Sequence, residues 1–260
     1  MTDQRLDVVI SDGVARIHLN RPGAANAIDL TFAKEFEVAA QSCLSSHVRV
    51  VLVTAAGRQF CAGGDLKSFA KESDIGAYLE EVTSHLHAGI AILVEMDAPV
   101  IVAVTGAVAG AGLGLVCAAD IVVAGESASF VWAYSRVGLT PDGSSSWFLP
   151  QNIGLRRALD LSLTNRVLTA QEALDWGLVS RAVADDKVLS DAEDIVAQLA
   201  QGPTAAYGAS ARLLRSASEN TLRTHLNLET ASIVERARTA DGLEGIRAFI
   251  ERRPPEFNGE

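Results

Sequence analysis

The feature of the sequence that most limits the fold is a run of 22 residues without a charged side chain, at residues 98–119 (APVIVAVTGAVAGAGLGLVCAA). This run is long enough to cross a bilayer as one helix. However, Pro99 lies near its start, four glycines interrupt it between residues 106 and 114, and no belt of Trp or Tyr flanks it. We therefore predict a buried strand, a glycine-rich loop and a buried helix, and no membrane partner.

The segments around this run alternate between apolar strands and helices. At the start of the chain, residues 6–10 (LDVVI) and 14–19 (VARIHL) flank the turn signal Ser11-Asp12-Gly13 and predict a hairpin. Strands that are apolar along nearly their whole length, as at residues 48–54 (VRVVLVT) and 119–125 (ADIVVAG), are typical of a parallel sheet covered on both faces. Helices are predicted between the strands at residues 31–44 and 75–96. The alternation indicates an α/β fold with crossover helices.

Strand signals become rare after about residue 153, where only residues 178–183 remain as a candidate strand. The last third has a helical composition, and Gln201-Gly202-Pro203 interrupts it. We therefore predict two parts, an α/β core with the active site at residues 1–195 and a helical region at residues 196–260. Such a helical region can pack on its own core or on a neighbouring subunit, and the sequence does not distinguish the two.

Charge and cysteine content narrow the function and the compartment. The net charge of −10 argues against a nucleic-acid partner, which requires a concentrated basic face, although a few cations still suffice for a small phosphorylated ligand. The three cysteines, Cys43, Cys61 and Cys117, show no CxxC spacing, so we expect neither a disulfide framework nor a zinc site. No signal peptide is apparent at the N-terminus. We therefore expect a cytoplasmic protein.

Two glycine-rich loops each stand between an apolar strand and a helix, at residues 60–66 (FCAGGDL) and 106–114 (GAVAGAGLG). Glycines expose backbone N–H groups, and the N–H groups at a helix start have no partner within the helix, so they can hold negative charge. The alternative interpretation is structural: Asp65 caps a helix in the first loop, and the second loop lets a helix pack closely on a strand. The second loop matches neither a dinucleotide fingerprint nor a phosphate loop.

In this order and separation, the two loops resemble those of the crotonase (enoyl-CoA hydratase/isomerase) superfamily. Residues 20–28 (NRPGAANAI), 128–143 (ASFVWAYSRVGLTPDG) and 248–257 (AFIERRPPEF) resemble it as well, so the resemblance covers essentially the whole chain. It implies an α/β fold with a spiral core of ββα units and a C-terminal helical region for trimerisation. It further implies an acyl-CoA thioester substrate that brings coenzyme A with it, no metal or other cofactor, and a homotrimer or hexamer.

The resemblance also assigns roles to individual residues. The backbone amides of Gly64 and Ala111 would form an oxyanion hole, which stabilises charge on a thioester carbonyl oxygen. Residues expected to line the coenzyme A and acyl sites are Ala24, Ala25, Ala62, Asp65, Leu66, Tyr134 and Phe249, with Phe249 near the adenine of its own or a neighbouring subunit. Cations close to the loops, such as Arg21 and Lys67, are expected at the surface, where some can meet the phosphates of coenzyme A.

The chain departs from the superfamily at its acid and base positions. Hydratases of the superfamily use two glutamates, and the corresponding residues here are Gly114 and Tyr134. Asp142, in the sequence Pro-Asp-Gly, is the leading substitute, although by local sequence alone it belongs to a β-turn. Members similar to the ring-epoxide isomerases of phenylacetate degradation carry a catalytic aspartate in this context. A single carboxylate suits a 1,3-proton shift, because it can remove a proton at one carbon and return it at another.

We therefore predict an acyl-CoA isomerase that shifts a double bond, or rearranges a ring epoxide, through an enolate. Three alternatives stay open. One is an enoyl-CoA hydratase with other acid and base residues. Another resembles the 4-halobenzoyl-CoA dehalogenases, in which the aspartate is a nucleophile and His87 would match their histidine, although Gly64 replaces an aromatic residue of that group. The third is an acyl-CoA-binding protein without catalysis.

Overall fold

The computed structural model describes residues 4–260. Its main sheet has six strands in the order β1-β2-β3-β5-β7-β10, with β1 antiparallel to β2 and the other neighbours parallel. The strands are β1 (Leu6–Ser11), β2 (Val14–Leu19), β3 (Val50–Ala55), β5 (Val100–Val104), β7 (Ile121–Gly125) and β10 (Arg181–Val183). The predicted hairpin is confirmed, and its turn residues Asp12 and Gly13 have φ values of 52° and 74°. The α/β fold is confirmed as well.

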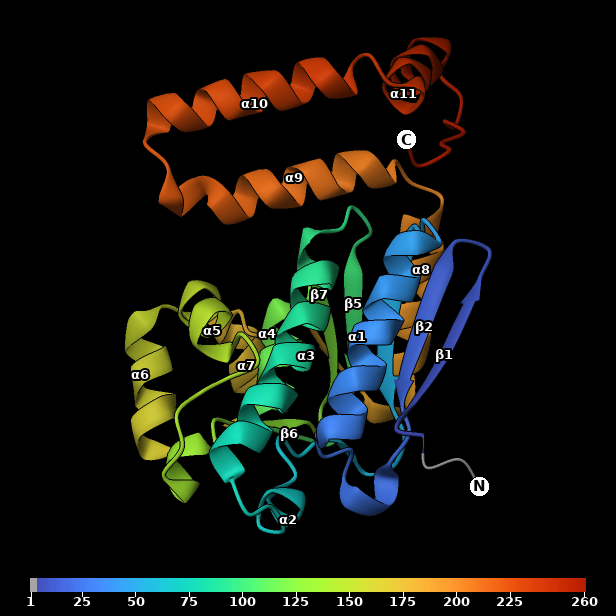
Figure 1. Ribbon diagram of the computed structural model, residues 1–260. Helices are drawn as coiled ribbons and strands as arrows, with labels where there is room; N and C mark the ends of the chain where they lie inside the picture. Colours follow the sequence, from blue (N-terminus) through green and yellow to red (C-terminus); the bar gives the residue numbers. More distant parts are fainter. Residues whose placement is uncertain (1–3) are drawn as a thin grey trace.

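Helices cover both faces of this sheet, as Figure 1 shows. On one face, α1 (Leu30–Ser45) and α3 (Ile75–Glu95) pack side by side over a large apolar core. On the other face, α8 (Val188–Ala200) buries Val188, Ala192, Ile195 and Val196 against β3, β5 and β7. The inner strands are therefore covered on both sides, which explains why their sequences are apolar throughout.

The charge-free run forms the predicted strand, loop and helix. Its strand is β5, its helix is α4 (Ala111–Ala118), and the loop between them contains the short strand β6 (Ala107–Ala109). Nearly every residue of α4 is buried, which accounts for its lack of polar side chains. No helix within residues 4–260 has the length and hydropathy that a membrane-spanning helix needs.

A second, smaller sheet was not predicted. Its order is β4-β6-β8-β9, and its strands are β4 (Gln59–Cys61), β6, β8 (Ser129–Val131) and β9 (Leu168–Thr169). Strands of two or three residues are too short to show a period of two, so the sequence pattern does not reveal them. This sheet matters for the site because β4 and β6 pair in parallel, which places the two glycine-rich loops next to each other.

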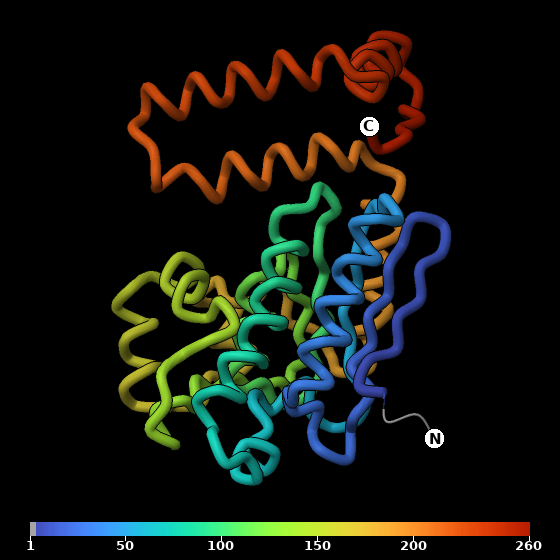
Figure 2. The backbone as a smooth tube through the Cα atoms, viewed as in Figure 1, coloured from blue at the N-terminus to red at the C-terminus, as the bar shows by residue number. Residues whose placement is uncertain are grey.

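The C-terminal helices leave the core after α8, as the orange and red part of the backbone shows in Figure 2. They are α9 (Thr204–Ser216), α10 (Leu222–Arg236) and α11 (Ala240–Glu251). No residue of α10 is buried within the described chain, and apolar side chains such as Leu222 and Ile233 are 76% and 69% exposed. The predicted division at residues 195 and 196 falls inside α8, and the assignment of separate roles to the two parts stays a prediction.

The remaining α-helices lie at the left side and at the lower end of the molecule in Figure 1. They are α2 (Leu66–Phe69), α5 (Ser145–Ile153), α6 (Leu155–Thr164) and α7 (Ala170–Trp176).

The three cysteines are buried and unpaired, at positions 43, 61 and 117. Burial raises the pKa of Cys61 to about 12, so this thiol stays protonated and is a poor nucleophile despite its position between the two loops.

Candidate active site

The first glycine-rich loop ends at the start of α2. Gly63 has a φ of 84°, and the carboxylate of Asp65 caps α2 by accepting hydrogen bonds from the N–H groups of Lys67 and Ser68. The structural interpretation of Asp65 as a helix cap is therefore confirmed. The N–H group of Gly64, in contrast, has no hydrogen-bond partner among residues 4–260, so it is free to bind a ligand.

The second loop places another free amide at the start of α4. Gly110 is the N-cap, with a φ of 51°, and no side chain caps the helix. The N–H group of Ala111, the first residue of α4, makes no hydrogen bond within the described chain. The positive end of the helix dipole adds to its affinity for negative charge. Both amides of the predicted oxyanion hole are thus unpaired.

Close backbone contact holds the two loops together. A Cβ atom on Gly63 would lie 2.8 Å from the carbonyl oxygen of Ala109, and one on Gly112 would lie 2.7 Å from Cβ of Cys61. Glycine is required at both positions because any side chain would push the loops apart. Close packing of helix on strand, the structural alternative for the second loop, is therefore present together with the free amides, and the two interpretations are compatible.

Asn26 fixes the first loop from the other side, and the sequence analysis missed it. Its side chain is fully buried, and its Nδ2 donates hydrogen bonds to the carbonyls of Ala56, Gln59 and Phe60. Its Oδ1 accepts a hydrogen bond from the N–H of Arg21. The side chain of Asn26 thus joins residues 20–28, which contain two of the predicted coenzyme A-binding residues, to β4. The only sequence signal was its place within the stretch 20–28.

Asp142 lies beside the start of α4. Its neighbour Gly143 packs on Ala111, since a Cβ atom on Gly143 would be 3.4 Å from Cα and Cβ of Ala111. A Cβ atom on Gly114 would come within 1.9 Å of the carbonyl oxygen of Gly143. The segment with Asp142 is therefore seated on the face of α4 that carries Ala111 and Gly114, and a side chain at position 114 has no room.

Two side chains contact this segment. The hydroxyl group of Tyr134 lies 2.7 Å from Oδ1 of Asp142, and the Tyr134 side chain is 8% exposed. His87, an exposed residue of α3, accepts a hydrogen bond at Nε2 from the N–H of Gly143 over 3.0 Å. Its Nε2 lone pair is therefore engaged, and its ring proton is on Nδ1. The structure thus brings His87 next to the segment with Asp142, where its Nε2 is engaged by the backbone of Gly143.

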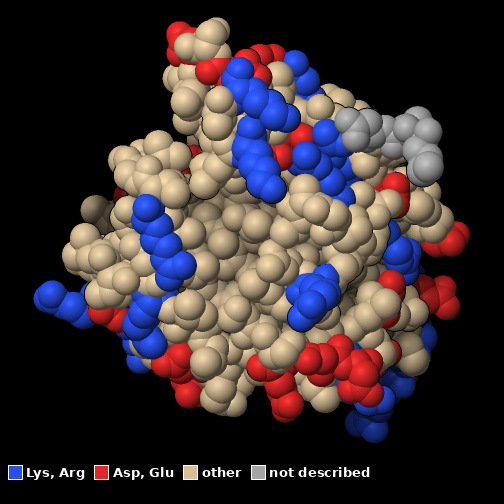
Figure 3. All heavy atoms as spheres, turned by 90° about the horizontal axis from the view of Figure 1, so that it is seen from below, with Lys and Arg blue, Asp and Glu red and all other residues tan. Residues whose placement is uncertain are grey.

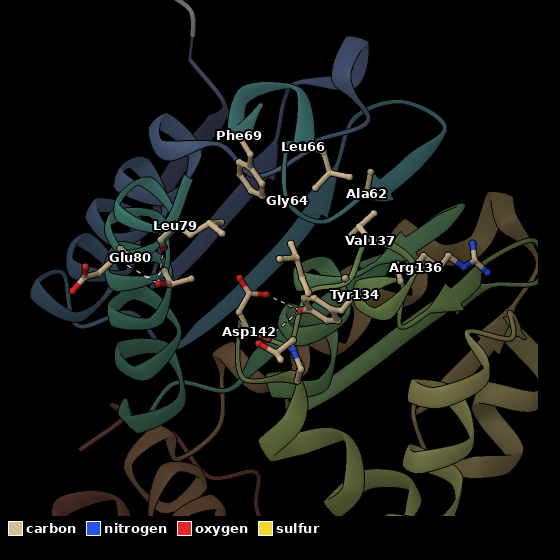
Figure 4. A pocket seen from close by; sticks show the side chains of 17 residues that line it. Ala62, Gly64, Leu66, Phe69, Leu79, Glu80, Tyr134, Arg136, Val137 and Asp142 are labelled. Carbon is tan, nitrogen blue, oxygen red and sulfur yellow. Dashed lines mark hydrogen bonds between the residues drawn. The ribbon is translucent and has the colours of Figure 1, made fainter. Parts of the chain in front are cut away.

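These elements enclose a cavity of about 580 Å³. Figure 4 shows it between α3 and the segment that carries Tyr134 and Asp142, with Phe69 and Gly64 on another side. Residues from both glycine loops line it, including Ala62, Gly64, Leu66 and Gly110. The rest of the lining is mainly apolar. The ring of Phe69 occupies the space that a side chain at position 64 would need, since a Cβ atom there would lie 2.7 Å from the ring, so Phe69 supplies an aromatic wall.

The residues predicted to line the coenzyme A site do not all reach this cavity. Ala62 and Leu66 line it, whereas Ala25 borders a separate hollow of about 660 Å³ with Pro22 and Gly57. Ala24 ends the short 3-10 helix Pro22–Ala24. Phe249 is 85% exposed on α11, far from α2 in Figure 1, so it cannot line the cavity of its own chain.

Arg21 is not the surface cation that was expected. Its guanidinium group makes ion pairs with Asp65 and Asp29 at 2.9 Å and 3.0 Å, and Arg5 pairs with Asp29 as well. Burial acts to raise the pKa of Asp65, but the hydrogen bonds from Arg21 and from the α2 amides outweigh it and lower this pKa. The carboxylate of Asp65 therefore holds the loop, and the guanidinium group of Arg21 is engaged with two carboxylates of its own chain. Figure 3 shows an uncharged hollow at this end of the molecule, with Lys and Arg side chains on several sides of it and Asp and Glu side chains along its lower edge.

Two free amides on neighbouring loops, the carboxylate of Asp142 and a mainly apolar cavity thus lie together at this end of the molecule. The chain matches the enoyl-CoA hydratase/isomerase family over residues 9–260, and it belongs to this family. Among its relatives, the 1,2-epoxyphenylacetyl-CoA isomerase of Escherichia coli is 37% identical over 96% of this chain and 97% of the relative. The Rhodobacter capsulatus protein named "Probable enoyl-CoA hydratase" is also 37% identical, over 96% of each chain.

Solved structures confirm the crotonase fold. The enoyl-CoA hydratase of Bacillus anthracis matches with a TM-score of 0.92 at 30% identity, over 99% of this chain and 100% of the other. The protein is thus an enzyme of the enoyl-CoA hydratase/isomerase family, whose relatives are named for both activities. Within residues 4–260, no group of three or more His, Cys, Asp or Glu side chains is arranged to hold a metal ion.

Proposed function

We propose that this protein is an acyl-CoA isomerase that works through a thioester enolate, with Asp142 as its acid and base. The observation that carries the proposal is the position of Asp142, which lines the cavity beside the helix start that presents the free amide of Ala111. The other carboxylate of the lining, Glu80, is exposed on α3, and Figure 4 shows it turned away from Asp142. One carboxylate is therefore available at the reacting carbon atoms.

The closed position at Gly114 disfavours hydration. Addition of water to a 2-enoyl-CoA requires one group that activates the water and one that supplies a proton, which are the roles of the two superfamily glutamates. A glutamate at position 114 would collide with the carbonyl oxygen of Gly143, and position 134 holds a tyrosine. The site retains one carboxylate, which is sufficient for a reaction that removes and returns a single proton.

The reaction on a 3-enoyl-CoA balances with these groups alone. The carboxylate of Asp142 takes a proton from C2, and the electrons of that bond move toward the thioester, whose oxygen becomes negative. The amides of Gly64 and Ala111 donate hydrogen bonds to this oxygen, and loss of one such donor typically costs about 10²–10³ in rate. The protonated Asp142 then returns the proton at C4, which gives the 2-enoyl-CoA. Coenzyme A is part of the substrate, and no further cofactor takes part.

Separate incubations with a 3-enoyl-CoA and a 2-enoyl-CoA test the proposal. The expected result is migration of the double bond in the first and little water addition in the second. A 3-hydroxyacyl-CoA as the main product would instead indicate a hydratase and overturn it. Asp142→Asn is expected to lose turnover by about 10³-fold or more while it still binds acyl-CoA, because an amide cannot accept the proton. Full turnover in this variant would exclude Asp142 as the acid and base.

The acyl group requires its own assay. The apolar cavity has space for straight-chain, aromatic or ring-derived acyl groups, and the E. coli relative is named for a ring-epoxide substrate. We include a ring-epoxide acyl-CoA among the proposed substrates for this reason. A panel of these acyl-CoA esters, ranked by kcat/KM, would identify the preferred class, and equal values across the panel would contradict a dedicated substrate.

We further propose that the protein is a cytoplasmic homotrimer or a dimer of trimers. The support is the apolar surface that α10 and α11 expose, on which Leu226, Ile233 and Ile250 are 49%, 69% and 73% exposed. Burial of such side chains against a neighbour would gain about 25 cal/mol for each Å² removed from water. Light scattering of the purified protein is expected to give the mass of three or six chains. A monomeric mass would refute the proposal.

A further inference from the structure

The side chain of Tyr134 is built into the site beside Asp142. Its ring packs edge-on against Trp132, with centroids 5.3 Å apart and an angle of 70° between the ring planes. Its hydroxyl oxygen lies 2.7 Å from Oδ1 of Asp142, 3.1 Å from the carbonyl oxygen of Asp142 and 3.3 Å from Oγ of Ser145. The ring is therefore fixed, and its hydroxyl group lies between Asp142 and Ser145, with the shortest contact to Oδ1 of Asp142.

The position of each proton in this cluster follows from the donors present. Tyr134 has one hydroxyl proton, and two oxygens of Asp142 lie within its reach. The hydroxyl group of fully buried Ser145 lies 2.7 Å from the carbonyl oxygen of Asp142 and donates to it. The proton of Tyr134 therefore goes to the carboxylate, where the shorter, charge-assisted hydrogen bond forms.

This hydrogen bond leaves Asp142 with one engaged and one open oxygen. Oδ1 accepts from Tyr134, whereas Oδ2 has no donor among residues 4–260. Figure 4 shows the carboxylate beside the Tyr134 ring at the edge of the cavity. Burial, followed by the negative charge of Asp142, raises the pKa of Tyr134, so its hydroxyl group keeps its proton and remains a donor.

We propose that Tyr134 is the positioning residue of this site, which holds Asp142 through Oδ1 so that its second oxygen faces the substrate. The inference rests on the proposed role of Asp142 as the acid and base. Hydratases carry a glutamate at position 134. The tyrosine at this position in our protein acts without transferring a proton to the substrate.

Tyr134→Phe removes only the hydroxyl group and is the direct test. With a 3-enoyl-CoA as substrate, kcat is expected to fall about 10- to 100-fold, which is the effect of losing one hydrogen bond to a charged group. KM is expected to stay within about threefold, because the tyrosine hydroxyl group is engaged with Asp142 and the substitution keeps the ring that lines the cavity. The acid limb of the pH profile of kcat/KM is expected to move to higher pH, since the carboxylate loses a donor that favours its charge.

Tyr207→Phe is the matched control. Tyr207 lies on α9, away from the cavity, and the same chemical change there is expected to leave kcat and the pH profile unchanged. Site-specific replacement of Tyr134 by 3-fluorotyrosine keeps the hydroxyl group and makes it a stronger donor. This variant is expected to move the acid limb to lower pH, opposite to Tyr134→Phe, and it remains informative if the phenylalanine variant fails to fold.

The outcomes separate this inference from the proposed function. Full activity of Asp142→Asn would reject Asp142 as the acid and base, and with it the role of Tyr134. An inactive Asp142→Asn combined with a Tyr134→Phe that matches Tyr207→Phe in kcat and pH profile would reject the positioning role alone. A 3-fluorotyrosine variant whose acid limb does not move would reject it as well.

Discussion

Gly114 offers a test in which two physical effects oppose each other. It lies inside α4 with ordinary helical geometry, so helix propensity alone predicts that Gly114→Ala stabilises the protein by up to about 1 kcal/mol. The added Cβ atom would, however, lie 1.9 Å from the carbonyl oxygen of Gly143. Restoring an ordinary contact of about 3.4 Å requires a shift of about 1.5 Å in the backbone next to Asp142.

The clash is expected to dominate. Overpacking of this kind costs about 1–3 kcal/mol, so the net change in the free energy of unfolding should be between zero and about 2 kcal/mol of destabilisation. Activity should suffer far more, because displacement of a catalytic group by about 1 Å can reduce the rate about 100-fold. The assays are kcat on a 3-enoyl-CoA and urea unfolding of the same preparation.

Gly245→Ala on α11 is the matched control for this prediction. It is also a helical glycine, and its Cβ atom would meet only the ring of Phe257, at 3.3 Å. A side-chain ring can move aside, so this variant should keep its activity and be at least as stable as the unmodified protein. If Gly114→Ala behaved in the same way as Gly245→Ala, the backbone of Gly143 would have to be more adaptable than the contact distance implies, and the structural reason for excluding a second glutamate would fail.

Two further predictions concern the residues around the loops. His87→Ala should reduce kcat by no more than about tenfold, because it removes one neutral hydrogen bond to Gly143. Complete loss of activity in this variant would instead show that His87 acts on the substrate. Asp65→Asn keeps an oxygen to cap α2 but loses the charge that pairs with Arg21, and should destabilise the protein at pH 7 by about 1–2 kcal/mol. Because the folded pKa of Asp65 is lowered, its stabilisation is present above the unfolded pKa of about 3.9 and is lost as the pH falls below it. Urea unfolding of both proteins at pH 7 and near pH 3 should therefore show a difference that shrinks in acid, and a constant difference would contradict the ion-pair explanation.

The sequence predicted the elements of the main sheet because each has a long, regular pattern. The apolar strands at residues 48–54 and 119–125 and the helix at residues 75–96 appear in the structure with ends displaced by only a few residues. The smaller sheet could not be predicted in this way, since its strands have two or three residues. Its pairs depend on contacts between segments far apart in the chain, such as Gln59 and Ala107, which are 48 residues apart.

The residues of the candidate site were likewise predicted only in part. Gly64, Ala111 and Asp142 could be proposed from motifs, because glycine loops at helix starts and an unusual aspartate are local features. The hydrogen bond from Tyr134 to Asp142 and the role of Asn26 as a bridge were not visible, since each joins side chains to partners that only the folded backbone brings within about 3 Å.

The sequence by itself determined the family and the absence of the usual glutamates, because both depend on which residues follow one another, and it pointed through the family resemblance to the amides of Gly64 and Ala111. The tertiary structure decided which groups can act together. The carbonyl oxygen of Gly143 leaves no room for a side chain at position 114, and Asp65 forms an ion pair with Arg21. Phe249 lies away from the cavity of its own chain. The physical reason is that charge, hydrogen bonding and steric exclusion act over a few ångströms of space, whatever the separation of the residues along the chain.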